Sequence, residues 1–243
     1  INSKLSSTFV SMSIICLMLL IAITMMAAGL GFSNVMTRRK DQLVPCDNSY
    51  IYYEVKEDKL TPLETYEKSG IDLSAQVKGV NEVNVYSTEE FMLGSVLDKA
   101  KVTTDEVMSY IRKAPVNLVK LSEYNRERKF EGKKELALQM NQCAFLTTID
   151  AMGEVLDEVI ESDITVPFCG QELDVNKELI RDSICNEMIG NTPVVMIVPD
   201  ELLEGKKLTY EQAYLNMNYV NGSEKLSRIV EEKMDEVFHY QDN

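Results

Sequence analysis

A run of 33 residues without a single charged side chain opens this chain, between Lys4 and Arg38. Its most apolar part, Phe9 to Leu30, contains 22 residues and is rich in Leu, Ile, Met and Ala. A helix of roughly 20 apolar residues is long enough to cross a hydrocarbon core about 30 Å thick. The sequence therefore predicts a membrane-spanning helix, which we expect to be continuous and not buried in the core of a soluble domain.

Two other structures are compatible with the same run. A core helix rarely extends this far without a charge, because one of its faces usually meets water. A cleavable signal peptide has a shorter apolar region of roughly 7–15 residues after a basic segment. Here only Lys4 precedes the run, although the stretch "MMAAG" resembles a cleavage site with small residues. The spanning helix is the favoured interpretation, and the signal peptide is its first alternative.

The charges that flank the run bear on its orientation. Arg38, Arg39 and Lys40 follow it. Basic residues favour the cytoplasmic side of a membrane, so this flank alone would place the remaining chain in the cytoplasm. The chain begins at Ile1 instead of Met. We therefore expect residue 1 to be a cut end, so that basic residues upstream would be missing from the count.

The rest of the chain is strongly acidic. The protein has 25 Lys and Arg and 39 Asp and Glu, and four of the basic residues but none of the acidic ones lie in residues 1–40. Residues 41–243 therefore carry 21 basic and 39 acidic side chains, a net charge of −18. This charge argues against a nucleic-acid partner, because phosphate binding needs a cationic surface. It is typical of a solvated surface, and it would attract cationic ligands.

Cysteines leave the redox state open. Cys16 lies in the apolar run, whereas Cys46, Cys143, Cys169 and Cys185 lie in the acidic part. Four cysteines allow three pairings, among which a sequence does not choose, and free thiols are equally compatible. The chain has no CxxC pair and one histidine near its end, so it does not provide a usual zinc-binding set.

Alternating and amphipathic patterns predict strands and helices that are interspersed without a regular βαβ repeat. We therefore expect two parts: residues 1–40, a spanning helix with its flanks, and residues 41–243, an α+β domain with a mixed sheet and packed helices. The expected strands are residues 49–55, 79–87, 116–121, 142–150, a pair within 163–175, 194–198 and 213–220, and a further extended piece is expected at residues 135–138. The expected helices are residues 61–70, 90–100, 103–114, 123–130, 150–162 and 223–240.

Several helix starts carry capping residues. Thr61 and Glu64 form a capping box, and Ser87 with Glu90 repeats the pattern. Ser122 is placed to cap residues 123–130. The last helix places Leu226, Ile229, Val230, Met234, Val237 and Phe238 at helical spacing, after a cap at Ser223. We expect this face to pack against the buried strand at residues 194–198.

No catalytic, cofactor-binding or metal-binding motif is present in the sequence: there is no GxGxxG, P-loop, HExxH, GxSxG or SxxK pattern. The acidic clusters "STEE", "DELLE" and "EEKMDE" lie at expected helix starts or on helical faces, where acids need no catalytic role. His239 is expected in the final helix, in a structural or surface role. We therefore expect no enzymatic site in this chain.

Three stretches together resemble one family, the FtsX-like permeases of ABC transporters, and most closely its bacitracin- and lantibiotic-resistance type. The stretch "LSEYNRERKFEGKKELAL" is similar to a stretch of their large extracellular domain, and "VVMIVPDELLEG" is similar to their "VVPD" turn. The opening run is similar to the transmembrane helix that precedes that domain. The matching positions are Leu121, Ser122, Tyr124, Asn125, Gly132, Lys133, Leu138, Val198, Pro199 and Asp200, with Ile197 in place of the first Val.

The resemblance implies that this chain is a slice of a longer permease in the cell membrane. Its N-terminus would face the cytoplasm and residues 41–243 would be extracytoplasmic, against the indication of the basic flank. Such permeases pair with a cytoplasmic ABC ATPase through other regions. Their outer domain transmits motion or engages an antimicrobial peptide or a lipid-linked target, and in some members it informs a sensor kinase. No cofactor or catalytic residue is implied.

Two other functions stay open: a single-pass, membrane-anchored extracellular binding or adhesion protein, and an anchored hydrolase with an unrecognised site. For the acidic domain we expect weak binding of a cationic peptide. Exposed charges are screened over about 8 Å at physiological ionic strength, so this binding should weaken as salt is added.

Overall fold

The computed structural model describes residues 2–53, 60–102, 111–113, 115–187, 193–220 and 224–239. It divides into two compact units, Ile1–Asp41 and Gln42–Asn243. This division lies one residue from the boundary expected from the sequence. The expected helical residues 103–110 and 114, and the expected cap at Ser223, lie outside the described residues.

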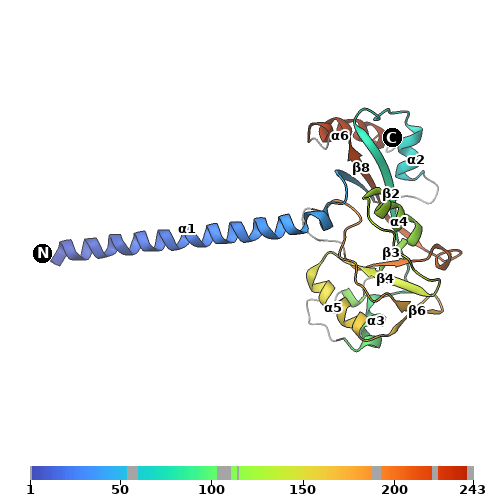
Figure 1. Cartoon of the computed structure of the whole chain (residues 1–243), viewed down its shortest axis with the longest axis horizontal. Coiled ribbons are helices and arrows are strands. Elements are labelled where there is room, and N and C mark those ends of the chain that lie inside the picture. Colours follow the sequence, from blue (N-terminus) through green and yellow to red (C-terminus); the bar gives the residue numbers. More distant parts are fainter. Residues whose placement is uncertain are drawn as a thin grey trace. The chain divides into compact units, whose positions relative to one another are not determined.

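The first unit is formed by helix α1 (Asn2–Leu43), drawn in blue in Figure 1, which extends two residues past the boundary between the units. Within it, Met12–Ser33 has a mean hydropathy of 2.5 and none of its residues is buried. Its apolar side chains lie on all sides of the helix instead of forming one stripe. A core helix would bury one face, and none of Met12–Ser33 is buried. The helix is continuous, as predicted, and is long and apolar enough to cross a membrane.

The second unit is built on a mixed, eight-stranded sheet with the strand order β1-β8-β2-β3-β7-β4-β6-β5. The β3–β7 and β4–β6 pairs are parallel and the other neighbours are antiparallel. The α+β class predicted from the sequence is therefore confirmed. The strands are β1 (Asn48–Tyr53), β2 (Val77–Ser87), β3 (Asn117–Lys120), β4 (Gln142–Leu146), β5 (Thr165–Phe168), β6 (Gln171–Val175), β7 (Val195–Val198) and β8 (Thr209–Tyr219).

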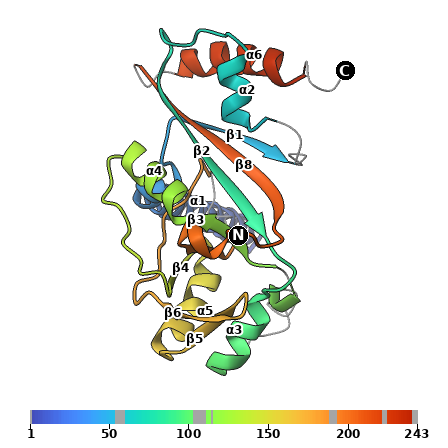
Figure 2. The same ribbon diagram turned by 90° about the vertical axis from the view of Figure 1, so that its right-hand side faces the viewer.

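Helices cover both ends of this sheet. Figure 2 shows α2 and α6 at the β1–β8–β2 end and α3 and α5 at the other end. The helices of the second unit are α2 (Pro62–Lys68), α3 (Leu93–Ala100), α4 (Leu121–Phe130), α5 (Asp150–Glu161) and α6 (Glu224–His239), with 3-10 turns at η1 (Ile111–Lys113) and η2 (Asp200–Leu202).

The buried strand β7 shows how the core is divided. Val195 and Ile197 pack with Tyr124 of α4, whereas Met196 and Val198 pack in a separate cluster with α3 and α5. Successive side chains of a strand point to opposite faces, so apolar residues at every position require cover on both sides. The continuous apolar run that predicted a buried strand therefore reflects a sheet covered on both faces.

Local capping signals were only partly correct. In α2 the Thr61 hydroxyl accepts a hydrogen bond from the Glu64 N–H at 3.3 Å and the Glu64 carboxylate accepts one from the Thr61 N–H at 3.1 Å, as predicted. The second capping box is wrong, because β2 continues through Ser87 and α3 begins only at Leu93, after Met92. The Ser87 hydroxyl donates instead to the Glu211 carboxylate on the neighbouring strand β8.

The final helix α6 packs on a different part of the sheet than predicted. Val230 and Met234 are buried, Leu226 is half-buried, and Ile229 is 41% exposed. Their partners are on β1, β2 and β8, and include Leu215. Strand β7 was the wrong partner because α4, α3 and α5 already cover its two faces. The side chains of residues 237–239 lie outside the described ones.

Candidate functional site

The two stretches that carry the family resemblance in the second unit meet in the fold. Strands β3 and β7 are parallel neighbours, so α4, which follows β3, and the Pro199–Asp200 turn, which follows β7, leave the sheet at the same edge. The Ser122 N–H donates to Asp200 Oδ1 at 3.0 Å, and its hydroxyl donates to Oδ2 at 2.5 Å. Asp200 thus caps α4 from a distant part of the chain. Ser122 lies inside the helix, so its prediction as the cap is wrong.

Asn125 holds the next segment against α4. Its Oδ1 accepts from the Leu136 N–H at 2.7 Å, and its Nδ2 donates to the Leu136 carbonyl at 2.9 Å. This side-chain amide therefore replaces the hydrogen bonds that a neighbouring strand would make. The segment 133–139 is thereby held beside α4 without belonging to a strand.

Ionic contacts join α4 to a third segment, residues 176–182. Arg128 lies 3.1 Å from the Asp182 carboxylate, and Lys133 lies 3.2 Å from the same oxygen. Lys133 also pairs with Glu131 at 2.7 Å. Gly132 has φ +74°, a left-handed conformation that ends α4 and turns the chain toward Lys133.

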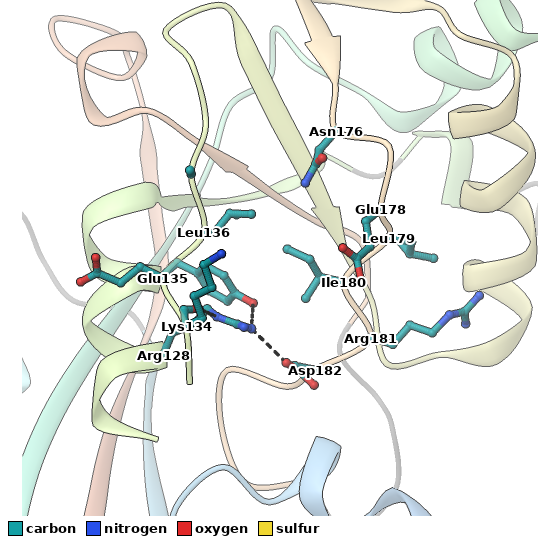
Figure 3. A pocket seen from close by; sticks show the side chains of 12 residues that line it. Arg128, Lys134, Glu135, Leu136, Asn176, Glu178, Leu179, Ile180, Arg181 and Asp182 are labelled. Carbon is teal, nitrogen blue, oxygen red and sulfur yellow. Dashed lines mark hydrogen bonds and ion pairs between the residues drawn. The ribbon is translucent and has the colours of Figure 1, made fainter. Parts of the chain in front are cut away.

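A cavity of about 560 Å³ opens between these three parts of the molecule. Figure 3 shows Lys134 and Leu136 on one side and Asn176, Glu178 and Ile180 on the other. A volume of this size is typical of ligand sites, which are usually about 300–1,000 Å³. The lining residues are Tyr124, Arg128, Lys134, Glu135, Leu136, Ala137, Asn176, Glu178, Leu179, Ile180, Arg181 and Asp182.

The charges that line the cavity differ in whether a partner neutralises them. Arg128 pairs with Asp182, and Arg181 pairs with Asp157 at 2.6 Å. By contrast, Lys134, Glu135 and Glu178 make no ion pair with any residue that the structure describes. The unpaired side chains therefore carry a net charge of −1, which adds to the acidic field of the domain.

Two carboxylates of α4 itself are buried on the side of the helix that faces the sheet, apart from the cavity. Burial raises the pKa of Glu127 to about 7, although the side-chain amides of Asn216 and Asn81 lower it. Burial also raises the pKa of Glu123, whose carboxylate accepts from the Asn84 N–H at 2.8 Å. Raised pKa values suit general acids, but neither carboxylate lines the cavity. Their position indicates a role in packing α4 on the sheet.

All five cysteines are free, which answers the question that the sequence left open. Cys46, Cys143 and Cys185 are buried, and burial raises the pKa of each thiol to about 12. Within the described ranges there is no group of three or more His, Cys, Asp or Glu side chains placed to hold a metal ion.

Sequence reasoning missed most of the cavity. Arg128 and Asp182 are 54 positions apart, and Ile180 lies in a stretch without regular structure, so no local pattern indicates that they share a site. The one local signal was the "YN" pair, Tyr124 and Asn125, which the resemblance singled out. Comparisons with protein-family models, with characterised proteins and with solved structures find no match to this chain.

Proposed function

We propose that this chain is part of the permease subunit of an FtsX-like ABC transporter of the bacitracin- and lantibiotic-resistance type. In this proposal α1 crosses the membrane, and residues 41–243 form an extracytoplasmic domain that engages a peptide substrate and transmits motion to the membrane helices. A separate cytoplasmic subunit hydrolyses ATP, and a sensor kinase is a further candidate partner.

The observation that carries the proposal is the contact between the two resembling stretches. The Ser122–Asp200 and Asn125–Leu136 hydrogen bonds involve residues of both motif stretches. They hold the start of α4 and the segment after it in position. The resemblance of the two stretches and their contact in the fold together support the proposal. The cavity beside α4 adds a ligand site of suitable size.

The orientation can be tested by thiol labelling. Glu204 is exposed in a turn outside the cavity, and a Glu204→Cys variant in a Cys169→Ser background offers one accessible thiol in the domain. We expect a membrane-impermeant maleimide to label it in intact cells as fully as in lysed cells. Labelling only after lysis would place the domain in the cytoplasm and overturn the proposal.

Substrate engagement can be tested by titrating the purified chain, in detergent micelles, with a cationic lantibiotic such as nisin at low and high salt. The net charge of −18 over residues 41–243 supports binding that weakens as salt rises. Equal binding at both salts would assign recognition to apolar contacts. Absence of binding at both would leave the acidic residues with a role in solubility only.

A second candidate, a single-pass anchored binding or adhesion protein, uses the same apolar helix and the same cavity. It differs in needing no ATPase. Recovery of an ATP-binding subunit with the chain from gently solubilised membranes supports the permease, and its reproducible absence supports the anchored protein.

A further inference from the structure

One wall of the cavity offers an unpaired backbone edge. Along residues 135–138, Leu136 and Leu138 are half-buried against the core, whereas Glu135 and Ala137 are exposed, which is the alternation of an extended chain. Leu136 directs its N–H and carbonyl to Asn125. The backbone groups of Glu135 and Ala137 consequently face the opposite edge. They make no hydrogen bond within the described part of the chain.

The other wall repeats this arrangement. The Ile180 N–H donates to the Phe145 carbonyl at 3.0 Å, and the Ile180 carbonyl accepts from the Thr147 N–H at 3.1 Å, which forms a parallel bridge beside β4. The backbone groups of Leu179 and Arg181 therefore face away from β4. They too have no hydrogen-bond partner among the described residues.

Both edges line the same cavity, from its two sides (Figure 3). We propose that this cavity is a slot for an extended peptide, which inserts as a strand and forms backbone hydrogen bonds with residues 135–137 on one wall and residues 179–181 on the other. The inference rests on the proposed function and deepens it, because it names how the peptide substrate is held.

The volume sets the length of the bound segment. A strand in a sheet occupies about 4.8 Å between neighbouring strands, about 10 Å between layers and about 3.4 Å along the chain for each residue. These spacings correspond to roughly 160 Å³ per residue. A cavity of about 560 Å³ therefore accommodates a segment of three to four residues.

The net charge of the domain, more than that of the slot itself, favours a cationic segment. The two arginines of the slot are neutralised by Asp182 and Asp157, which leaves Glu178 against Lys134, while the Glu135 carboxylate points away from the slot (Figure 3). The surrounding domain carries −18, so its field also attracts positive charge. In a peptide of alternating Lys and Val, the Val residues favour the extended conformation and the Lys residues supply the positive charge.

The test uses the purified full chain in detergent micelles and the peptide acetyl-Lys-Val-Lys-Val-Lys-amide, with binding measured by calorimetry. Methylation of the two Val amide nitrogens blocks one edge of the peptide, and methylation of the central Lys nitrogen blocks the other. We expect each methylated peptide to bind at least tenfold more weakly than the parent. The acidic counterpart, with Glu in place of Lys, should not bind.

Protein variants give a second readout on the same slot. Ala137→Pro removes one backbone donor and should weaken the parent peptide at least tenfold, whereas Ala137→Ser keeps the donor and should not. Glu178→Gln should weaken binding severalfold, and the matched change Glu204→Gln, outside the cavity, should leave it unchanged.

The outcomes separate the two levels of the proposal. If the methylated peptides bind as well as the parent, or if only one methylation pattern matters, the two-walled slot is overturned while peptide engagement stands. If neither this peptide nor nisin binds, peptide engagement itself is overturned. Because the methylated peptides act on the unaltered protein, misfolding of the Ala137→Pro variant would not remove the test.

Discussion

Glu127 offers the sharpest test of how α4 is held on the sheet. Its side chain is fully buried, and its Oε2 accepts a hydrogen bond from the Asn81 amide of β2 at 2.5 Å. Burial raises its pKa from 4.5 to about 7, and Glu131 raises it further, while Lys133 opposes the change. Between these two pH values the folded protein holds a proton that the unfolded chain has released.

The sign of the pH dependence follows from this difference. Below about pH 4.5 both states are protonated at this residue, and the residue does not change stability with pH. As the pH rises from about 4.5 to 7, the free energy of unfolding falls, since the folded state binds more protons than the unfolded state. A difference of roughly 2.5 pKa units corresponds to about 3 kcal/mol, and above pH 7 the loss is complete.

We therefore expect Glu127→Gln to stabilise the protein at high pH only. The neutral amide keeps an oxygen that can accept from Asn81, and it does not ionise. Relative to the wild type, the free energy of unfolding should be nearly unchanged at pH 4.5 and higher by about 3 kcal/mol at pH 8. Urea unfolding of the full chain in detergent micelles, followed by the near-UV circular dichroism of its tyrosines, measures this difference.

The matched control is Glu204→Gln, which alters an exposed turn. Its effect on the free energy of unfolding should be small and the same at both pH values. If Glu127→Gln shifts stability equally at pH 4.5 and pH 8, then folding does not raise the pKa of Glu127, and the argument from burial is refuted.

Three other predictions follow from packing and hydrogen bonding. Val230→Ala should lower the free energy of unfolding by roughly 2–4 kcal/mol. Ile229→Ala should lower it by well under half of that, because the Ile229 side chain is 41% exposed. Urea unfolding of the two variants measures the difference between them. Asn125→Ala should cost about 1–3 kcal/mol and speed hydrogen exchange at the Leu136 amide, and an unchanged exchange rate would contradict the hydrogen bond. Without any reductant, Ellman's reagent should detect at most two thiols in the native chain and all five after unfolding, since three are buried with raised pKa values; fewer than five would reveal a disulfide.

The parts of the fold that the sequence predicted are those governed by neighbours in the chain. The Thr61 capping box depends on residues three apart, and the alternation of residues 79–87 depends on residues two apart. The length of the charge-free run similarly predicts α1 with no information from the rest of the molecule. Such signals survive folding because the contacts they describe form within one element.

The parts that the sequence did not predict depend on strand order. The partner of α6 is the β1–β8–β2 end of the sheet, a fact set by which strands meet and not by the pattern of the helix itself. Ser122 has the chemistry of a cap, but Asp200 takes that position because β3 and β7 are parallel neighbours. The cavity requires residues 134–137 and 176–182 together, so no single window of sequence contains it.

Under the proposed function, the contacts of α4 would link peptide binding to motion of the domain. Asp200 fixes its start, Asn125 ties it to one wall of the cavity, and the Arg128–Asp182 pair ties it to the other. Glu127, on the side of α4 that faces the sheet, is buried, and its contribution to the free energy of unfolding varies with pH. A peptide bound between the two walls would add hydrogen bonds that oppose their separation, and so would resist any displacement of α4 from the sheet. Conversely, any force that displaces α4 would strain both walls and weaken peptide binding. Peptide binding and displacement of α4 would then oppose each other, and this reciprocal coupling is what a motion-transmitting binding domain requires.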